Sequence, residues 1–213
     1  MRVQKTVIIY YKMCWNSRVS MNTFLISTFA VLLAYGNGNI DFFKVAFFMS
    51  FISLQFIEFM IWDKTLSNRL VSQIGLFLIM CQPILSILLI NNKKIIIPVL
   101  LCYAIFLIIL FTFICPLQNI DFRSIKAKNG HLSWKWLSFP IVVILIWMGF
   151  LLFKFIYNKE WILLAFMIIL VLSSLLLFYK TETWGSMWCW VSNVIAIYLI
   201  YKIFANEFCL TSF

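Results

Sequence analysis

Long apolar runs alternate with short polar breaks along almost the entire chain. The runs are about 17–21 residues long, so that as helices they would cross the roughly 30 Å hydrocarbon core of a bilayer. The pattern predicts seven membrane-spanning helices over residues 19–35, 42–62, 70–90, 95–115, 139–157, 161–179 and 186–204. The predicted fold class is therefore all-α, a polytopic membrane protein with a bundle of seven transmembrane helices.

The polar breaks consist of residues that end helices and are costly to place in lipid, mainly Gly, Asn and Lys. Most are short: GNGNID, DKTLSNR, NNKK, YNKE and KTETWG. The break over residues 116–138 is long and basic and begins with Pro116. No internal repeat accompanies it, and we predict one domain over residues 13–213. Residues 1–12 are interpreted as an N-terminal extension before a second candidate start at Met13.

Composition supports lipid as the solvent of this chain. Charged residues make up 11% and hydrophobic residues 64%, whereas a soluble domain carries about 25% charged residues. The net charge of +10 comes from Lys and Arg placed singly or in pairs at the ends of apolar runs, where they reach lipid phosphates. Because no basic strip is interleaved with aromatic residues, we expect the lipid bilayer and no nucleic acid as partner.

The distribution of basic residues predicts an orientation. The side that contains the N-terminus and the long break has 11 Lys and Arg, and the opposite side has 6. An excess of basic residues marks the cytoplasmic side, so we expect a cytoplasmic N-terminus and a C-terminus on the opposite side. A start at Met13 would narrow this margin to 8 against 6.

Polar side chains inside the predicted spans are candidates for function or for helix packing. Gln55, Glu58 and Trp62 are spaced i, i+3 and i+7, which places them on one face of a helix. Gln82 precedes Pro83 in the third run. A proline inside a helix leaves a backbone carbonyl open, and an amide such as that of Gln82 could satisfy it.

Seven alternating spans bring four reactive side chains to the same membrane face: Cys14, Glu58, His131 and Cys189. A thiolate, a carboxylate and an imidazole together could ligate a metal ion or activate a thiol nucleophile, so these four are the candidate catalytic residues. The sequence specifies neither a metal nor a cofactor. Each residue also has a plain structural reading, because a free cysteine usually fills apolar space and a histidine after the Asn129-Gly130 turn is an ordinary loop residue.

Further polar and aromatic residues near this face are predicted to line a pocket. Tryptophan near the ends of spans is also typical of interfacial anchoring. The predicted pocket-lining residues are Asn16, Gln55, Trp62, Gln82, Trp134, Trp188 and Asn193.

Five stretches of the chain resemble a family of uncharacterised multi-pass membrane proteins of large DNA viruses and bacteria. They are MCWNSRVSMNTF, QFIEFMIW, CQP, HLSW and GSMWCW. Members of that family open with Met-Cys-Phe/Trp-Ser/Asn and carry a Gln-x-x-Glu-x-x-x-Trp helix. The resemblance covers residues 13–213, implies no known activity, and leaves residues 1–12 outside the family pattern. The positions that it marks are Cys14, Gln55, Glu58, Trp62, Gln82, Pro83, His131, Trp134, Trp188 and Cys189.

The sequence thus predicts a multi-pass integral membrane protein with a polar pocket at the inner face, and it specifies no reaction. A protein that binds or transports a small molecule or lipid requires a cavity lined by Gln55, Glu58 and Gln82. A membrane-embedded thiol- or metal-dependent hydrolase acting on lipid requires the four candidate catalytic side chains to meet. A structural protein of a host or virion membrane requires neither.

Overall fold

The computed structural model describes residues 16–117 and 120–210. The predicted extension over residues 1–12 and the candidate catalytic residue Cys14 lie outside this part of the chain.

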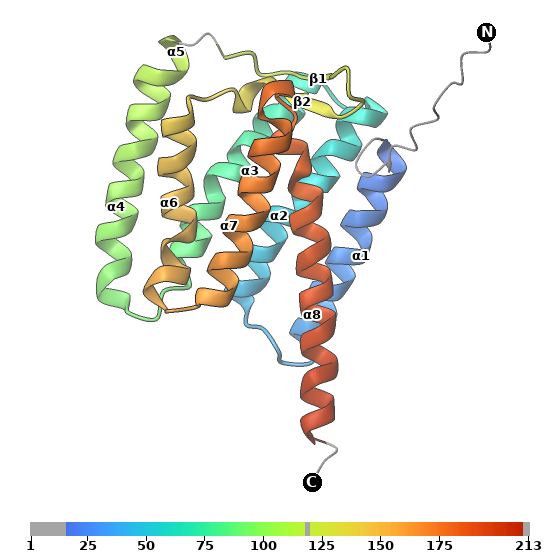
Figure 1. Ribbon diagram of the computed structural model, residues 1–213, viewed down its shortest axis with the longest axis vertical. Helices are drawn as coiled ribbons and strands as arrows, with labels where there is room; N and C mark the ends of the chain where they lie inside the picture. Colours follow the sequence, from blue (N-terminus) through green and yellow to red (C-terminus); the bar gives the residue numbers. More distant parts are fainter. Residues whose placement is uncertain (1–15, 118–119, 211–213) are drawn as a thin grey trace, which may run out of the picture.

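Long helices dominate the described residues and run roughly side by side (Figure 1). Six of them are long and apolar enough to cross a membrane, the fourth, fifth and sixth of these together with the short turns that adjoin them. This confirms the prediction of an all-α, polytopic bundle. The helix α6 is also apolar but has 17 residues, so its crossing of the bilayer stays a prediction. The long helices are α1 (Ser17–Gly36), α2 (Phe42–Asp63), α3 (Asn68–Leu88), α4 (Lys93–Ile109), α6 (Ile141–Tyr157), α7 (Trp161–Phe178) and α8 (Trp188–Leu210).

The helices differ in how much of their surface lies inside the protein. The helix α2 packs against α1, α3 and α8, and α3 also packs against α6. At least half of α2, α3 and α8 is buried, whereas only 17% of α4 and of α7 is. Because the exposed faces of α4 and α7 are apolar, they are suited to contact with lipid.

The helix α1 is held close to its neighbours by a stripe of small residues. These recur every three or four positions, so they form a single buried face: Ser20, Thr23, Ser27, Ala30, Val31 and Ala34. Small side chains let helix backbones approach closely in a membrane. The Ser27 hydroxyl uses this closeness to donate a hydrogen bond to the Ser192 carbonyl oxygen of α8 at 3.1 Å.

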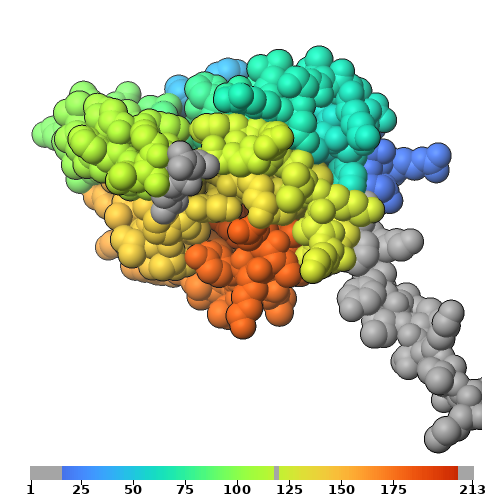
Figure 2. Space-filling view, turned by 90° about the horizontal axis from the view of Figure 1, so that it is seen from above, coloured from blue at the N-terminus to red at the C-terminus, as the bar shows by residue number. Residues whose placement is uncertain are grey.

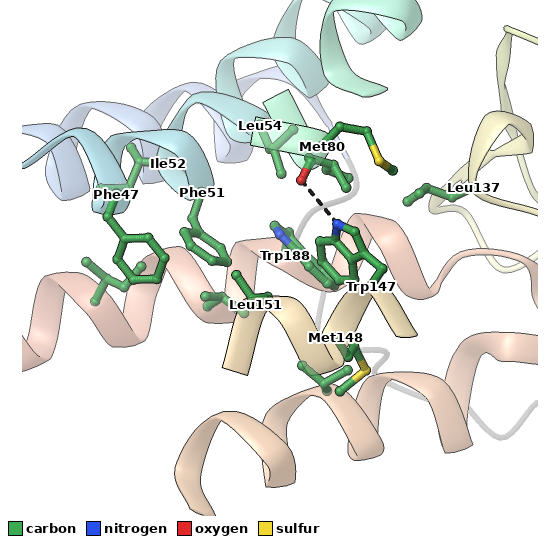
Figure 3. Packing of buried hydrophobic residues seen from close by; sticks show 14 of the residues in the cluster. Phe47, Phe51, Ile52, Leu54, Met80, Leu137, Trp147, Met148, Leu151 and Trp188 are labelled. Carbon is green, nitrogen blue, oxygen red and sulfur yellow. Dashed lines mark hydrogen bonds between the residues drawn. The ribbon is translucent and has the colours of Figure 1, made fainter. Parts of the chain in front are cut away.

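Two aromatic side chains from α4 and α6 bond backbone oxygens of α3 close to its internal proline. Pro83 lacks the N–H that would bond the carbonyl oxygen of Ile79, four residues earlier. Trp147 of α6 donates its indole N–H to that oxygen at 3.3 Å (Figure 3). Tyr103 of α4 donates to the adjacent Met80 carbonyl oxygen at 2.8 Å.

The hypothesis that Gln82 satisfies the oxygen freed by Pro83 is therefore wrong. The Gln82 amide instead donates to the Ser50 carbonyl oxygen of α2 at 3.3 Å. The two large aromatic donors come from other helices, and a sequence pattern confined to one helix does not include them.

The long polar break contains an antiparallel hairpin that was not predicted. Its strands are β1 (Ser124–Lys126) and β2 (Leu132–Trp134), joined through a turn in which Gly130 has a φ of 89°. Figure 2 shows this segment lying across one end of the bundle, between the ends of α2 and α3 and those of α7 and α8. The chain enters it through a π-helical turn (Leu110–Ile114) and α5 (Cys115–Leu117), and leaves it through the 3-10 turn Lys135–Leu137.

Polar contacts tie the hairpin to the helices beneath it. Ser124 Oγ lies 2.9 Å from Ser72 Oγ of α3 and accepts a hydrogen bond from the Trp136 indole at 3.0 Å. The Asn68 side chain bonds both the N–H and the carbonyl oxygen of Ser124 at 2.8 Å. The hairpin is thus a fixed cap over this end of the bundle.

A glycine under the hairpin gives a stability prediction. A Cβ at Gly185, in the 3-10 turn Trp184–Met187, would lie 2.7 Å from a Trp134 ring carbon and 2.8 Å from a Leu137 methyl. We expect Gly185→Ala to lower the free energy of unfolding by about 1–3 kcal/mol through overpacking. Thermal unfolding in detergent micelles measures this. The matched control is Gly149→Ala in α6, where a Cβ meets nothing within 4 Å; equal stability of the two variants would contradict the packing.

The N-cap of α2 gives a second prediction. The Asp41 carboxylate accepts from the Lys44 N–H at 2.9 Å and pairs with the Lys44 ammonium at 2.8 Å. The hydrogen bond from the Lys44 side chain holds the pKa of Asp41 below its ordinary value. A carboxyl group whose pKa is lower in the folded than in the unfolded protein stabilises the fold when it is ionised. The ionised Asp41 therefore stabilises the protein at neutral pH, and this contribution is lost as the pH falls below the ordinary aspartate range.

We expect Asp41→Ala to lower the free energy of unfolding by about 1 kcal/mol at neutral pH, because it removes the cap of α2. Asp41→Asn keeps the cap and should lose only the small contribution of an exposed ion pair, about 0–1 kcal/mol. Thermal unfolding from pH 7 down to pH 3 separates the two effects. An Asp41→Asn variant as unstable as Asp41→Ala would show that the cap contributes nothing.

Candidate functional site

Three polar side chains form a column on one face of α2, as their spacing predicts: Gln55, Glu58 and Trp62. Gln55 and Glu58 have no exposed surface. Glu58 lies five residues before the end of α2, which is about 7–8 Å of helix. Its carboxylate accepts a hydrogen bond from the Ser20 hydroxyl of α1 at 3.5 Å. The column therefore faces the interface between α2 and α1.

Most polar atoms of this column have no hydrogen-bond partner among the described residues. They are Gln55 Oε1, Gln55 Nε2, Glu58 Oε1 and Trp62 Nε1. No described Lys or Arg lies within ion-pair distance of Glu58. A buried polar group without a partner costs several kcal/mol at membrane depth, and such groups in native proteins point to a functional role or to a bound water or ion.

The hairpin end of the column is positively charged. The Lys126 ammonium of β1 lies 5.9 Å from the centre of the Trp62 ring, within the range of a cation–π contact. Trp62 is half-buried, whereas Lys126 is exposed. The column thus begins beneath a cation at the capped end of the bundle and extends to Gln55, about 10 Å deeper along α2.

Gln82 belongs to a different part of the interior. It lies between α3 and α2, where its amide nitrogen bonds the Ser50 carbonyl oxygen and its Oε1 has no partner in the described part of the chain. Two cavities stand out in the structure, and neither is lined by Gln55, Glu58 or Gln82. The first is an enclosed space of about 10 Å³ next to Trp188, and the second is a groove of about 580 Å³ on α3 and α4.

The candidate catalytic residues in the described chain have different neighbours. His131 is buried at the hairpin and meets the Phe178 ring of α7 edge to face at 5.7 Å. Cys189 is fully buried at the start of α8 and is disulfide-bonded. While this bond persists, Cys189 supplies no thiolate. Among the described residues, no three His, Cys, Asp or Glu side chains form a group that would hold a metal ion.

The remaining predicted pocket residues have structural contacts. Asn16 caps α1 by accepting from the Val19 N–H at 3.0 Å. Trp134 is fully buried and stacks on Trp136 at 4.8 Å. Trp188 packs between two other tryptophans, and Asn193 is half-buried on α8. Trp134 and Trp188 are thus core residues of the capped end as well as candidates for pocket lining.

Sequence reasoning missed Ser20 and Lys126, which contact Glu58 and Trp62. The small-residue periodicity of α1 was a usable signal for Ser20, because it marks the face that packs closely. No signal identified Lys126, since its position depends on the hairpin.

Replacing Gln55 tests whether the buried polar atoms of the column lower the free energy of unfolding. We expect Gln55→Leu to raise the free energy of unfolding by about 1–2 kcal/mol, because it removes two buried polar atoms that have no partner. Gln82→Leu is the matched control, since it breaks the bond to Ser50 and should not stabilise. Thermal unfolding in one detergent compares them. A loss of stability in Gln55→Leu would mean that the amide is satisfied within the fold.

Comparison with protein-family models, with curated proteins and with solved structures finds no match to this chain. The resemblance of its motifs to a family of viral and bacterial membrane proteins therefore stays a prediction.

Proposed function

We propose that this multi-pass membrane protein binds a small polar solute, uncharged or cationic, in the column formed by Trp62, Glu58 and Gln55. The observation that carries the proposal is the set of buried polar atoms in that column without partners among the described residues. An intramembrane carboxyl group is costly to keep, and such groups usually mark a ligand, ion or proton path.

The atoms of the column define the chemistry of the solute. Glu58 Oε1 and Gln55 Oε1 accept hydrogen bonds, whereas Gln55 Nε2 and Trp62 Nε1 donate them. A suitable solute therefore carries both N–H or O–H donors and an acceptor atom. An anion is disfavoured because it would face the Glu58 carboxyl group. Because Gln55 and Glu58 have no exposed surface and neither cavity reaches them, binding requires α1 to move away from α2 at the Ser20–Glu58 contact.

The orientation of the protein is part of this proposal. The excess of basic residues favours a cytoplasmic position for the end that carries the hairpin. A disulfide exposed there would meet a reducing environment, and complete burial of Cys189 is the feature that would protect it. The site would then open to the cytoplasm, in a host or virion membrane.

The other parts of the proposal follow the sequence. We propose the lipid bilayer as the main partner and expect no binding to nucleic acid. We also propose that the chain belongs to the family that its motifs resemble. A thiol-dependent enzyme would require reduction of the Cys189 disulfide first. The positions of Glu58 and His131 do not favour an enzymatic function over binding.

Binding is tested with three defined probes: methylammonium, ethanolamine and acetamide. We expect at least one to raise the thermal unfolding temperature of the detergent-solubilised protein at constant ionic strength. Ligand at about 100 times its Kd stabilises by about 2.7 kcal/mol. Glu58→Gln should abolish the shift, because it removes the carboxyl group and preserves the shape.

Glu160→Gln is the matched control, since Glu160 pairs with Lys154 at 2.6 Å at the opposite end of the bundle. This variant should retain the ligand-induced shift. If none of the three probes stabilises the wild-type protein, or if Glu58→Gln responds as the wild type does, the proposed site is wrong.

A further inference from the structure

An open groove of about 580 Å³ runs between α3 and α4. Its volume is within the roughly 300–1,000 Å³ range of sites that hold a drug-sized or lipid-sized molecule. The lining comes only from these two helices and the π-helical turn that continues α4: Gln73, Leu76, Phe77, Met80, Cys81, Ile84, Leu107, Ile108, Phe111 and Thr112. One wall of the groove is α4, of which only a small part is buried, so the groove is suited to contact with lipid.

Polarity changes along the groove in the direction of the membrane normal. Gln73 lies five residues after the start of α3, and Thr112 lies five residues before the end of α5. Both are therefore about 7–8 Å from the hairpin end of the bundle. The lining below them is apolar down to Ile84, about 16 Å deeper than Gln73 along α3. A phospholipid has the same sequence of groups, with its polar glycerol above and its acyl chain below.

A cation lies above the polar end of the groove. Arg69 precedes Gln73 by four residues and so lies on the same face of α3, one turn closer to the hairpin end. It is exposed, and no described carboxylate is within ion-pair distance of it. Asp121 pairs with Arg123 at 2.9 Å and attracts Arg69 only from beyond ion-pair distance. Arg69 is thus available to a phosphate at the level of the lipid headgroups.

The backbone of α4 changes where it borders the groove. The turn Leu110–Ile114 is π-helical and carries the lining residues Phe111 and Thr112. Single π-helical turns inside membrane and soluble helices are frequently found at functional sites. The wider turn redirects these two side chains relative to a regular α-helix.

We propose that this groove binds one anionic phospholipid, with an acyl chain between α3 and α4 and the headgroup phosphate at Arg69. The lipid would be held in a fixed position, whereas the lipid around the rest of the bundle exchanges freely. This site is separate from the column at Glu58, and neither proposal depends on the other.

Native mass spectrometry of the detergent-solubilised protein tests the proposal with phosphatidylglycerol and phosphatidylcholine of the same acyl chains. We expect the wild type to retain one phosphatidylglycerol and to prefer it to phosphatidylcholine. Ile108→Trp should weaken retention about tenfold, because the indole occupies the space of the acyl chain. Arg69→Gln should reduce the preference for phosphatidylglycerol about fivefold, because one cation near the phosphate is lost.

Two matched variants control for general effects. Ile109→Trp places the same ring on the next residue of α4, about 100° around the helix and outside the groove. Lys180→Gln removes a cation at the same end of the bundle, after α7. Both should bind phosphatidylglycerol as the wild type does. Circular dichroism confirms that each variant is folded.

The proposal is overturned if Ile108→Trp and Ile109→Trp retain equal amounts of lipid, or if the wild type shows no preference between the two lipids. A phospholipid with a photoactivatable acyl chain gives an independent readout. Its crosslinks should map to the groove lining on α3 and α4, and crosslinks confined to α7 would contradict the site. These outcomes are unaffected by Glu58→Gln, so the two proposed sites can fail separately.

Discussion

Every backbone N–H and carbonyl group at membrane depth needs a partner inside the protein, because lipid offers none. Pro83 is the point where this constraint acts most strongly, since it leaves the Ile79 carbonyl oxygen open. The indole of Trp147 bonds that oxygen, and the Tyr103 hydroxyl bonds the adjacent Met80 oxygen. One proline in α3 thus requires a donor from outside the helix, and α6 supplies it. The Tyr103 bond joins α4 to α3 one residue further along the chain.

The same constraint accounts for the hairpin cap. A polar segment of this length would leave many backbone groups open near the membrane interface. Ser124 instead bonds Ser72, Asn68 and Trp136 at once, which joins β1 to the end of α3 and to the segment that leads into α6. The cap also brings the Lys126 ammonium to 5.9 Å from the centre of the Trp62 ring, at the hairpin end of the polar column.

The column on α2 gathers four buried side-chain polar atoms without a described partner on one helix face, and further such atoms lie singly on Thr28, Gln82, Ser133, Trp134 and Trp188. The small residues of α1 bring that helix close enough for Ser20 to reach Glu58, yet the other polar atoms of Glu58 and Gln55 have no described partner. Elsewhere in the bundle, the buried Ser27 and Ser86 hydroxyls bond carbonyl oxygens of neighbouring helices. The grouping of such atoms on one face of α2 is the reason for proposing a function for the column and a structural role for Ser27 and Ser86.

The sequence by itself determined the apolar helices, because lipid acts on each run independently of the others. It also determined that Gln55, Glu58 and Trp62 share a face, since that relation depends only on helix geometry. Tertiary structure alone decided that Trp147 rather than Gln82 bonds the oxygen freed by Pro83, that the long break forms a hairpin, and that Ser20 meets Glu58. Those contacts join residues 12 to 68 positions apart. Their formation depends on how whole helices pack, and no local periodicity in the sequence encodes that packing.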